Sequence, residues 1–336
     1  MLRIGMIGCG GISNHHAKRL KQIENAQIVH CADVNAAAAE KMAQEYGAAK
    51  HGGDYRALLD DKDVDAVFVC LPTFLHRDAV VAAAQAGKHI FCEKPIAMTS
   101  QDAKEMIQAC KKAKVTFMIG FVRRFDAHWG KVAELVKAGR IGRPVLWRHC
   151  SASGGPANPW YLNREQGGGP LIDGAVHDYD FHRSMFGDAR RVFGSMKTYK
   201  SDSTALDTGT GVIQFKSGDE AMLCWSWGLP KGSRGENLID VLGPAGTILF
   251  SAPPDKLPAG TDPKTHGGVT VIGEGGQTTI EPYEKKDMFL DQDRHFVDCV
   301  LNKKKPIPTG KDGRKALEIG LGILKSSGTG KPVRLG

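Results

Sequence analysis

The sequence predicts a two-domain α/β protein, with a doubly wound parallel sheet over residues 1–121 and an α+β domain over residues 122–336. Up to about residue 121, short apolar runs alternate with helical stretches, which is typical of repeated β-α-β units. The run at 64–71 is nearly all apolar, as expected for a parallel strand buried on both faces. After residue 190, strand-like runs follow one another without helices between them, which favours an open, mainly antiparallel sheet.

The elements of the first domain follow from hydrophobic periodicity and turn residues. Its strands are expected at residues 2–7, 27–32, 64–71, 88–92 and 115–119. Its helices are expected at residues 14–23, 35–46, 55–60, 75–86 and 100–113. Thr99 and Asp102 form a capping-box pattern that opens the last of these helices.

The second domain is predicted to start with helices separated by Gly- and Pro-rich segments. A series of strands follows, and two helices end the chain. Its helices are expected at residues 129–138, 173–186, 287–301 and 312–325. Its strands are expected at residues 191–200, 208–215, 220–228, 238–242, 247–250, 269–272 and 277–280. Much of 251–276 is expected to form a long surface loop with a short hairpin.

The composition is that of an ordinary globular protein. Hydrophobic residues make up 41% and charged residues 24% of the 336 residues, with a mean hydropathy of −0.27. This argues against a disordered chain, and no apolar run approaches the roughly 20 residues of a spanning helix. We therefore expect no membrane association.

Charge and cysteine usage narrow the class of protein further. The net charge is +8, but the densest basic cluster is 303–305 and most other basic residues are interspersed with acidic ones, so no nucleic-acid partner is expected. The eight cysteines are spread singly without zinc-site spacing, which favours reduced thiols. A strand-like segment stands where a secretory signal would lie, and we expect a cytoplasmic protein.

A glycine-rich turn lies between the first strand and the first helix. Gly8, Gly10 and Gly11 precede Ile12 in a pattern that lets a dinucleotide pyrophosphate approach the backbone and the helix N-terminus. Ser13 stands where a third glycine is usual. A simple glycine turn within a sheet is the alternative interpretation.

Asp33 ends the second strand, at the spacing of an acidic residue that accepts hydrogen bonds from a ribose 2′-hydroxyl. Its charge would repel a 2′-phosphate, and residues 34–37 offer no basic group to hold one. The expected cofactor is therefore NAD rather than NADP. The alternative is that Asp33 merely caps the following helix.

Glu93, Lys94 and Pro95 directly follow the strand at 88–92. Because the carboxyl ends of parallel strands line the ligand crevice, Lys94 is expected to face it. An ammonium group there can stabilise a developing alkoxide and hydrogen-bond a substrate hydroxyl. A solvated loop lysine remains the alternative.

Asp173, His177 and Asp180 are spaced four and three residues apart, so they share one face if the segment is helical. A carboxylate beside an imidazole suits a general base that takes a hydroxyl proton. A metal site and a purely structural helix start are the other interpretations. No metal is predicted, because no further His or Cys lies nearby at ligand spacing.

These motifs together resemble the Gfo/Idh/MocA oxidoreductase family. The resemblance runs the length of the chain and is carried by five segments: 8–13, 71–76, 93–95, 120–126 and 167–180. It implies an N-terminal Rossmann domain, with Lys94, Asp173 and His177 as the catalytic residues and His177 as the proton acceptor. It also implies that Thr73, His76, Glu93 and Arg124 contribute to the cofactor and substrate cleft. Gly174 and Ala175 depart from the family pattern, in which a variable residue is followed by glycine, so helix packing is expected to differ slightly.

Two further residues are candidates for ligand contact. Arg124 lies at the predicted domain junction and could reach either ligand, or form an interdomain salt bridge. Trp160, beside Tyr161, could form an aromatic wall over the nicotinamide or a sugar ring, or pack in the core.

The leading hypothesis is an NAD-dependent dehydrogenase of a secondary alcohol in an inositol-like cyclic polyol or sugar. One rival is a sugar-modifying enzyme that uses a transient NAD redox step for elimination or epimerisation. Another is a non-catalytic NAD- or sugar-sensing regulator, which need not retain Lys94, Asp173 and His177. A homodimer or homotetramer through the second-domain sheet is expected, because an open sheet face is often buried against another copy.

Overall fold

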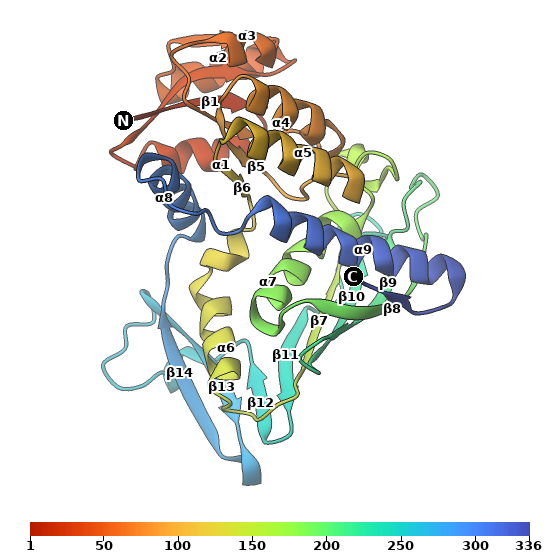
Figure 1. Ribbon diagram of the computed structural model, residues 1–336. Coiled ribbons are helices and arrows are strands. Elements are labelled where there is room, and N and C mark those ends of the chain that lie inside the picture. Colours follow the sequence, from red (N-terminus) through yellow and green to blue (C-terminus); the bar gives the residue numbers. More distant parts are fainter. The chain divides into compact units, whose positions relative to one another are not determined.

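The computed structural model describes residues 1–336, which form two compact units (Figure 1). The first unit comprises 1–122 and 287–317, and the second comprises 123–286 and 318–336. All residues after 121 were expected in the second domain, whereas 287–317 cluster with the first unit. No helix of the structure is both long and apolar enough to cross a lipid bilayer.

The first unit is built on a parallel six-stranded sheet. Its strands are β1 (Leu2–Ile7), β2 (Ala26–Ala32), β3 (Lys50–Gly52), β4 (Ala66–Val69), β5 (His89–Cys92) and β6 (Phe117–Ile119). Their order is β3-β2-β1-β4-β5-β6, so the direction of winding reverses between β1 and β4. At such a switch point the loops after neighbouring strands diverge and leave a crevice for a ligand.

Helices cover both faces of this sheet. They are α1 (Gly11–Leu20), α2 (Ala36–Tyr46), α3 (Tyr55–Asp60), α4 (His76–Gln85), α5 (Ser100–Ala113) and α8 (Met288–Leu301), with a short turn η1 (Thr73–Leu75). α1 contacts α2 and α8, whereas α4 contacts α3 and α5. These two groups of helices lie on opposite faces, because right-handed crossovers in the two halves of the sheet run in opposite directions. Phe68 and Phe91 stack in the core with ring centroids 4.5 Å apart.

The second unit is built on a nine-stranded mixed sheet. Its strands are β7 (Leu146–Ala152), β8 (Ala189–Lys197), β9 (Thr208–Phe215), β10 (Glu220–Ser226), β11 (Leu238–Gly243), β12 (Gly246–Leu249), β13 (His266–Ile272), β14 (Thr278–Glu284) and β15 (Val333–Arg334). Their order is β14-β13-β12-β11-β7-β10-β9-β8-β15, and only β7 and β10 pair in parallel. The predicted fold class, a parallel α/β sheet followed by a mainly antiparallel α+β domain, is confirmed.

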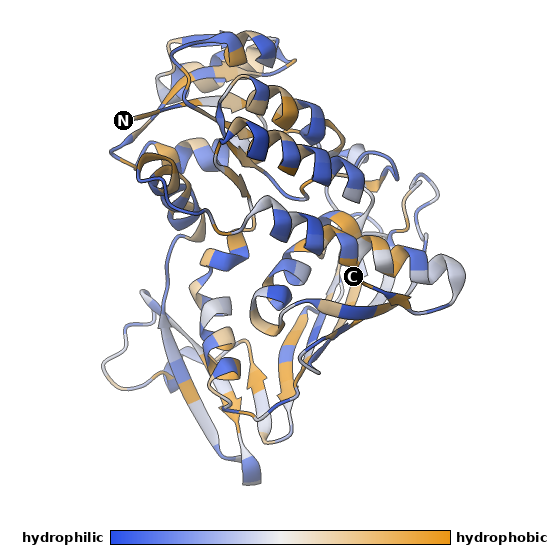
Figure 2. Ribbon diagram, viewed as in Figure 1, coloured by the Kyte–Doolittle hydropathy of each residue, from blue (hydrophilic) through white to orange (hydrophobic).

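The remaining helices belong wholly or partly to this second unit. They are α6 (Ala127–Lys137), α7 (Val176–Phe186) and α9 (Gly310–Thr329), with the short turns η2 (Val122–Phe125), η3 (Pro159–Leu162), η4 (Pro170–Gly174), η5 (Pro254–Lys256) and η6 (Glu274–Gly276). α9 runs from the first unit into the second and is apolar on one side and polar on the other (Figure 2). Along the strands, buried and more exposed side chains alternate, so one face of the sheet meets the helices and the other is open.

The central strand of this sheet, β7, was not predicted from the sequence. β7 pairs with β10 on one side and with β11 on the other, yet its sequence contains Arg148 and His149. Arg148 lies on the open face, where it forms a bidentate ion pair with Asp240 of β11. His149 points to the buried face, so the strand lacks the apolar alternation by which strands are recognised.

Candidate active site

The glycine-rich turn after β1 has the geometry of an anion-binding loop. Gly8 has φ +89°, and a Cβ there would lie 2.5 Å from the carbonyl oxygen of Cys70, so only glycine fits. An added Cβ at Gly10 or Gly11 would meet nothing within 4 Å, which leaves room for a ligand beside the backbone. No side chain caps the start of α1, so its first N–H groups, including that of Ile12, are available to a phosphate.

Ser13, which replaces the third glycine of the usual pattern, holds this turn. It is fully buried, and its hydroxyl donates a hydrogen bond of 2.6 Å to the carbonyl oxygen of Gly8. The departure from the glycine pattern therefore adds a hydrogen bond inside the turn.

Asp33 belongs to the same turn. One carboxylate oxygen accepts a hydrogen bond of 2.7 Å from the backbone N–H of Cys9, and the other accepts one of 2.8 Å from that of Asn35. Asn35, not Asp33, is the N-cap of α2, because its side chain accepts from the Ala38 N–H. The interpretation of Asp33 as a helix cap is thus wrong, and its half-exposed carboxylate lies beside the glycine turn, at the position expected for a ribose contact.

Thr73 and His76 follow β4 and differ in their hydrogen bonding. Thr73 is 2% exposed, and its hydroxyl oxygen has no hydrogen-bond partner within the protein. A buried hydroxyl without a partner is costly unless a ligand satisfies it, so Thr73 fits a ligand contact. His76 is fully buried, and its ring nitrogens lie 2.9 Å and 2.8 Å from the carbonyl oxygens of Pro95 and Leu71, so it joins the loops after β4 and β5.

The segment after β5 places a buried carboxylate beside a half-exposed lysine. Glu93 is 7% exposed, and one of its oxygens accepts a hydrogen bond of 3.1 Å from the backbone N–H of Lys94. Its other oxygen lies 3.0 Å from a ring nitrogen of His16, a fully buried residue of α1. His16 is not among the residues predicted from the sequence.

The loops after β1, β4 and β5 therefore carry seven of the candidate residues at one edge of the first sheet: Gly8, Gly10, Gly11, Ile12, Thr73, Glu93 and Lys94. Asp33 joins them from the end of β2. An uncapped helix start, a carboxylate at the end of β2 and a buried hydroxyl fit the pyrophosphate, a ribose and a further polar group of a dinucleotide.

The second unit holds Asp173 and His177, in a local structure that differs from the predicted continuous helix. Asp173 lies in η4, a π-helical turn closed by a hydrogen bond of 2.8 Å from the Ala175 N–H to the Pro170 carbonyl, and α7 begins only at Val176. An added Cβ at Gly174 would lie 2.8 Å from the Trp225 ring, so the turn packs closely on this aromatic residue. The prediction that Asp173 and His177 lie on one regular helical face is therefore wrong.

α7 is anchored by two ion pairs that sequence periodicity does not reveal. His149 of β7 lies 2.8 Å from the carboxylate of Asp178, and both side chains are buried. Burial lowers the pKa of His149, but Asp178 more than offsets this, and the pKa of His149 is raised. Asp180 is fully buried and accepts hydrogen bonds of 2.5 Å and 2.8 Å from the Arg124 guanidinium.

The Arg124–Asp180 ion pair lies within the second unit, not between domains. Two of the guanidinium nitrogens bond to a carboxylate on the helix that carries His177, which makes Arg124 a positioning residue for α7. We expect Arg124→Met to lower the free energy of unfolding by about 3–5 kcal/mol, because the buried carboxylate loses its guanidinium partner. Urea unfolding measures this change. The double variant Arg124→Met/Asp180→Leu should recover part of it, and equal instability of the single and double variants would contradict the expectation.

Aromatic residues pack beside the glycine-rich turn that precedes η4. Trp160 is half-buried and stacks on Tyr161 with ring centroids 3.8 Å apart, and Tyr161 meets Trp227 edge-on. An added Cβ at Gly167 would lie 2.7 Å from the Trp160 carbonyl oxygen, so the glycine-rich turn before η4 packs directly against this pair. The structure contains no group of three or more His, Cys, Asp or Glu side chains arranged to hold a metal ion.

Comparison with known proteins agrees with this arrangement. Residues 2–121 match the oxidoreductase family with an NAD-binding Rossmann fold, and 129–249 match the Gfo/Idh/MocA C-terminal domain. The chain is 33% identical to myo-inositol 2-dehydrogenase of Thermotoga maritima, over 99% of this chain and 98% of that protein. The chain belongs to the Gfo/Idh/MocA oxidoreductase family. The predicted resemblance is confirmed, and the protein is an oxidoreductase with NAD as its cofactor.

Two other members extend the comparison. The chain is 29% identical to scyllo-inositol 2-dehydrogenase (NAD(+)) of Bacillus subtilis, over 99% of this chain and 96% of that protein. The crystal structure of an aldose-aldose oxidoreductase from Caulobacter crescentus, complexed with glycerol, superposes with a TM-score of 0.83 at 28% identity, and covers 99% of both chains. Both domains of the family are therefore present in this chain.

Proposed function

We propose that this protein oxidises a secondary hydroxyl of an inositol-like cyclic polyol or sugar, with NAD as the hydride acceptor. The observation that carries the proposal is the similarity to a myo-inositol 2-dehydrogenase over 99% of the chain. The stacked Trp160–Tyr161 pair beside the glycine turn before η4 supports a ring-shaped substrate, since aromatic faces suit the apolar face of a sugar ring.

In this proposal the first unit holds the cofactor. The backbone at Gly8, Gly10, Gly11 and Ile12 binds the pyrophosphate, Asp33 accepts hydrogen bonds from a ribose, and the Thr73 hydroxyl contacts the cofactor. His76 and Glu93 keep the surrounding loops in place. When bound, NAD supplies the nicotinamide ring that takes the hydride.

The proposed catalytic steps use three side chains, those of Lys94, Asp173 and His177. The hydroxyl O–H bond breaks as its proton passes to an imidazole nitrogen of His177, and the developing alkoxide is stabilised by the Lys94 ammonium. Asp173 orients His177, Arg124 holds α7 through Asp180, and Trp160 contacts the substrate ring.

A panel of inositols, aldoses and sugar acids, followed by NADH absorbance, tests the proposed function. Stoichiometric NADH formation with a free polyol or sugar supports it. Turnover of a sugar without net NADH would favour elimination or epimerisation through a transient redox step. NAD binding without turnover of any member would favour a sensing role.

Cofactor preference depends on Asp33. We expect Asp33→Asn to lower the ratio of kcat/KM for NAD over NADP by about 10-fold or more, since hydrogen bonds to a charged group are worth about 1.5–3 kcal/mol. The amide keeps one oxygen that can accept from the Cys9 N–H, while the hydrogen bond from the Asn35 N–H is lost. Kinetics with both cofactors measure the ratio. The exposed Asp60→Asn serves as the charge-matched control, and an unchanged ratio in Asp33→Asn would exclude Asp33 from 2′-hydroxyl recognition.

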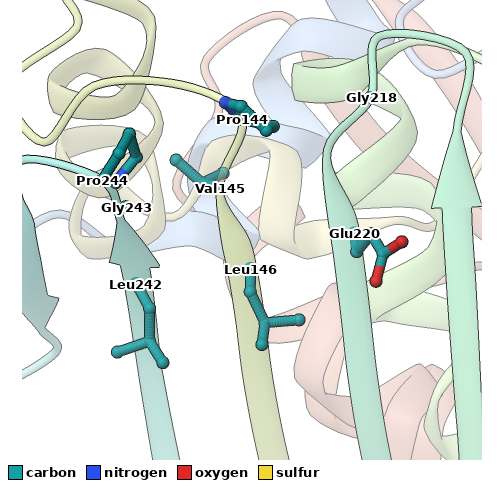
Figure 3. Close-up of a pocket in the computed structure, with 8 residues that line it drawn as sticks. All are labelled: Pro144, Val145, Leu146, Gly218, Glu220, Leu242, Gly243 and Pro244. Atoms are coloured by element: carbon teal, nitrogen blue, oxygen red, sulfur yellow. The ribbon is translucent and has the colours of Figure 1, made fainter.

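We also propose that the protein is a homodimer or homotetramer assembled through the open face of the nine-stranded sheet. Leu146 and Leu242 project from neighbouring strands into a hollow of about 410 Å³ on this face, bordered by Pro144 and Pro244 (Figure 3). On the same face Phe193 is 44% exposed. Apolar groups of this kind favour burial against a second copy.

Light scattering at micromolar concentration tests the assembly. We expect the wild type to be a dimer or tetramer and Met222→Glu, a change on the open face of β10 beside the central strand β7, to shift it to monomer. A monomeric wild type would contradict the proposal. We further propose a cytoplasmic location, which is supported by eight free cysteines, six of them buried.

A further inference from the structure

His16 occupies an unusual place in the first unit. Its side chain is fully buried, with one ring nitrogen 2.8 Å from the carboxylate of Asp293 on α8 and the other 3.0 Å from the carboxylate of Glu93 after β5. Phe91 and Phe289 meet the ring edge-on and Phe68 lies at a tilt, so no water-filled space adjoins it in these directions. A histidine between two buried carboxylates thus ties a helix to the end of a strand.

Both partners of the ring are hydrogen-bond acceptors, so both ring nitrogens donate when the imidazole carries its second proton. Burial lowers the pKa of His16, but Asp293 and Glu93 outweigh burial and raise the pKa to about 10. The protonated form of His16 is therefore favoured, because each ring nitrogen then donates to one carboxylate.

Three neighbouring residues fix the position of the Glu93 carboxylate. Its first oxygen faces His16, its second accepts the backbone N–H of Lys94, and a Cβ at position 120 would lie only 2.6 Å from the first oxygen. Gly120 therefore leaves just enough room for the carboxylate. Since Glu93 bonds back to the Lys94 backbone, a shift of its carboxylate would shift the start of the Lys94 loop.

The helix that carries His16 also carries the glycine turn. α1 starts at Gly11, and Ser13 on the same helix bonds to the Gly8 carbonyl oxygen. One helix therefore sets both the position of the pyrophosphate turn and, through Glu93, the position of Lys94.

We propose that His16 is a positioning residue for Lys94, acting through the carboxylate of Glu93. The inference rests on the proposed function, in which Lys94 stabilises the substrate alkoxide. His16 itself touches neither substrate nor cofactor, so its loss acts on kcat through a misplaced Lys94 loop. A misplacement of about 1 Å in an active site can cost about 10²-fold in rate.

Two neutral replacements separate the contacts of His16. In His16→Gln the amide nitrogen takes the place of the ring nitrogen that faces Glu93, whereas in His16→Asn it takes the place of the one that faces Asp293. We expect His16→Asn to lower kcat by about 10–100-fold and His16→Gln to keep most of it, although both variants lose the charge. NAD affinity, measured by protein fluorescence, should remain close to the wild-type value in both.

Asp293→Asn and His15→Gln are the matched controls. Asp293→Asn leaves the His16–Glu93 contact in place, so it should lower the unfolding temperature and keep kcat. His15 is exposed on the same helix, and its replacement should change neither quantity. All rates are compared below the unfolding temperature of the least stable variant, so that only folded enzyme is measured.

A purely structural role predicts that kcat falls equally in His16→Gln and His16→Asn, in step with their stability, and this result would overturn the inference. If His16→Asn does not fold, Asp293→Asn tests the inference instead. A variant Asp293→Asn with reduced stability and unchanged kcat supports the inference, and one with reduced kcat overturns it. The variant Lys94→Ala shows whether the inference about His16 or the proposed function itself is wrong. If Lys94→Ala keeps full activity, the role of Lys94 itself is wrong, whatever the His16 variants show.

Discussion

His177→Ala is expected to reduce kcat by about 10²–10⁴-fold, the usual contribution of a general base. The hydroxyl proton then has no imidazole to receive it, while the cofactor turn in the first unit is unchanged. NAD affinity should therefore stay at the wild-type value. Initial rates of NADH formation and a fluorescence titration with NAD measure the two quantities on the same preparation.

The pH profile adds a second test of the same residue. If His177 is the base, kcat of the wild type rises with pH as the imidazole loses its proton, and this inflection disappears in His177→Ala. His266→Ala, on β13 of the same unit, is the control for loss of an imidazole and should leave the profile unchanged. A His177→Ala enzyme with undiminished turnover would remove His177 from the mechanism.

The sequence signals for the proposed cofactor site are local. The glycine turn, Asp33 and Glu93-Lys94 each directly follow a strand, and parallel strands bring their carboxyl ends to one edge. Only glycine fits at position 8, because φ is positive there and an added Cβ would collide with the Cys70 carbonyl oxygen. Such backbone geometry is common in a short turn between a strand and a helix.

The parts that sequence reasoning missed depend on partners far away in the chain. His16 bonds to Glu93 and Asp293, which lie 77 and 277 residues further on, and nothing in the pattern of α1 indicates these contacts. Strand β7 escaped prediction because Arg148 is accommodated only by Asp240, 92 residues away. Residues 287–317, which were expected in the second domain, cluster with the first unit because α8 packs on α1.

The start of the helix that carries His177 was missed for a different reason. The residue spacing from Asp173 to Asp180 suits a regular helix, but the chain enters through Gly169 and Pro170 and forms a π-helical turn first. Gly169 has φ +81°, and a Cβ there would lie 2.6 Å from the Leu206 carbonyl oxygen. Tertiary packing around this glycine, which periodicity cannot show, sets where α7 begins.

Lys94→Ala is expected to lower kcat by about 10²–10³-fold, the range seen when one donor to a developing oxyanion is removed. The ammonium acts on charge that appears only as the hydroxyl loses its proton, so its loss should affect kcat more than substrate binding. Lys94→Arg keeps the charge but presents a planar, longer group, and should recover only part of the rate. Steady-state kinetics with the best substrate of the panel give kcat and KM for each variant.

Lys104→Ala, an exposed lysine on α5, is the control for loss of one positive charge from the first unit. It should leave kcat, KM and NAD affinity unchanged, because charges in solvent are screened over about 10 Å at moderate salt. If Lys94→Ala instead raises KM for the substrate with kcat unchanged, Lys94 contributes uniform binding and not stabilisation of the alkoxide. Equal kinetics of Lys94→Ala, Lys104→Ala and wild type would mean that Lys94 is a solvated loop lysine.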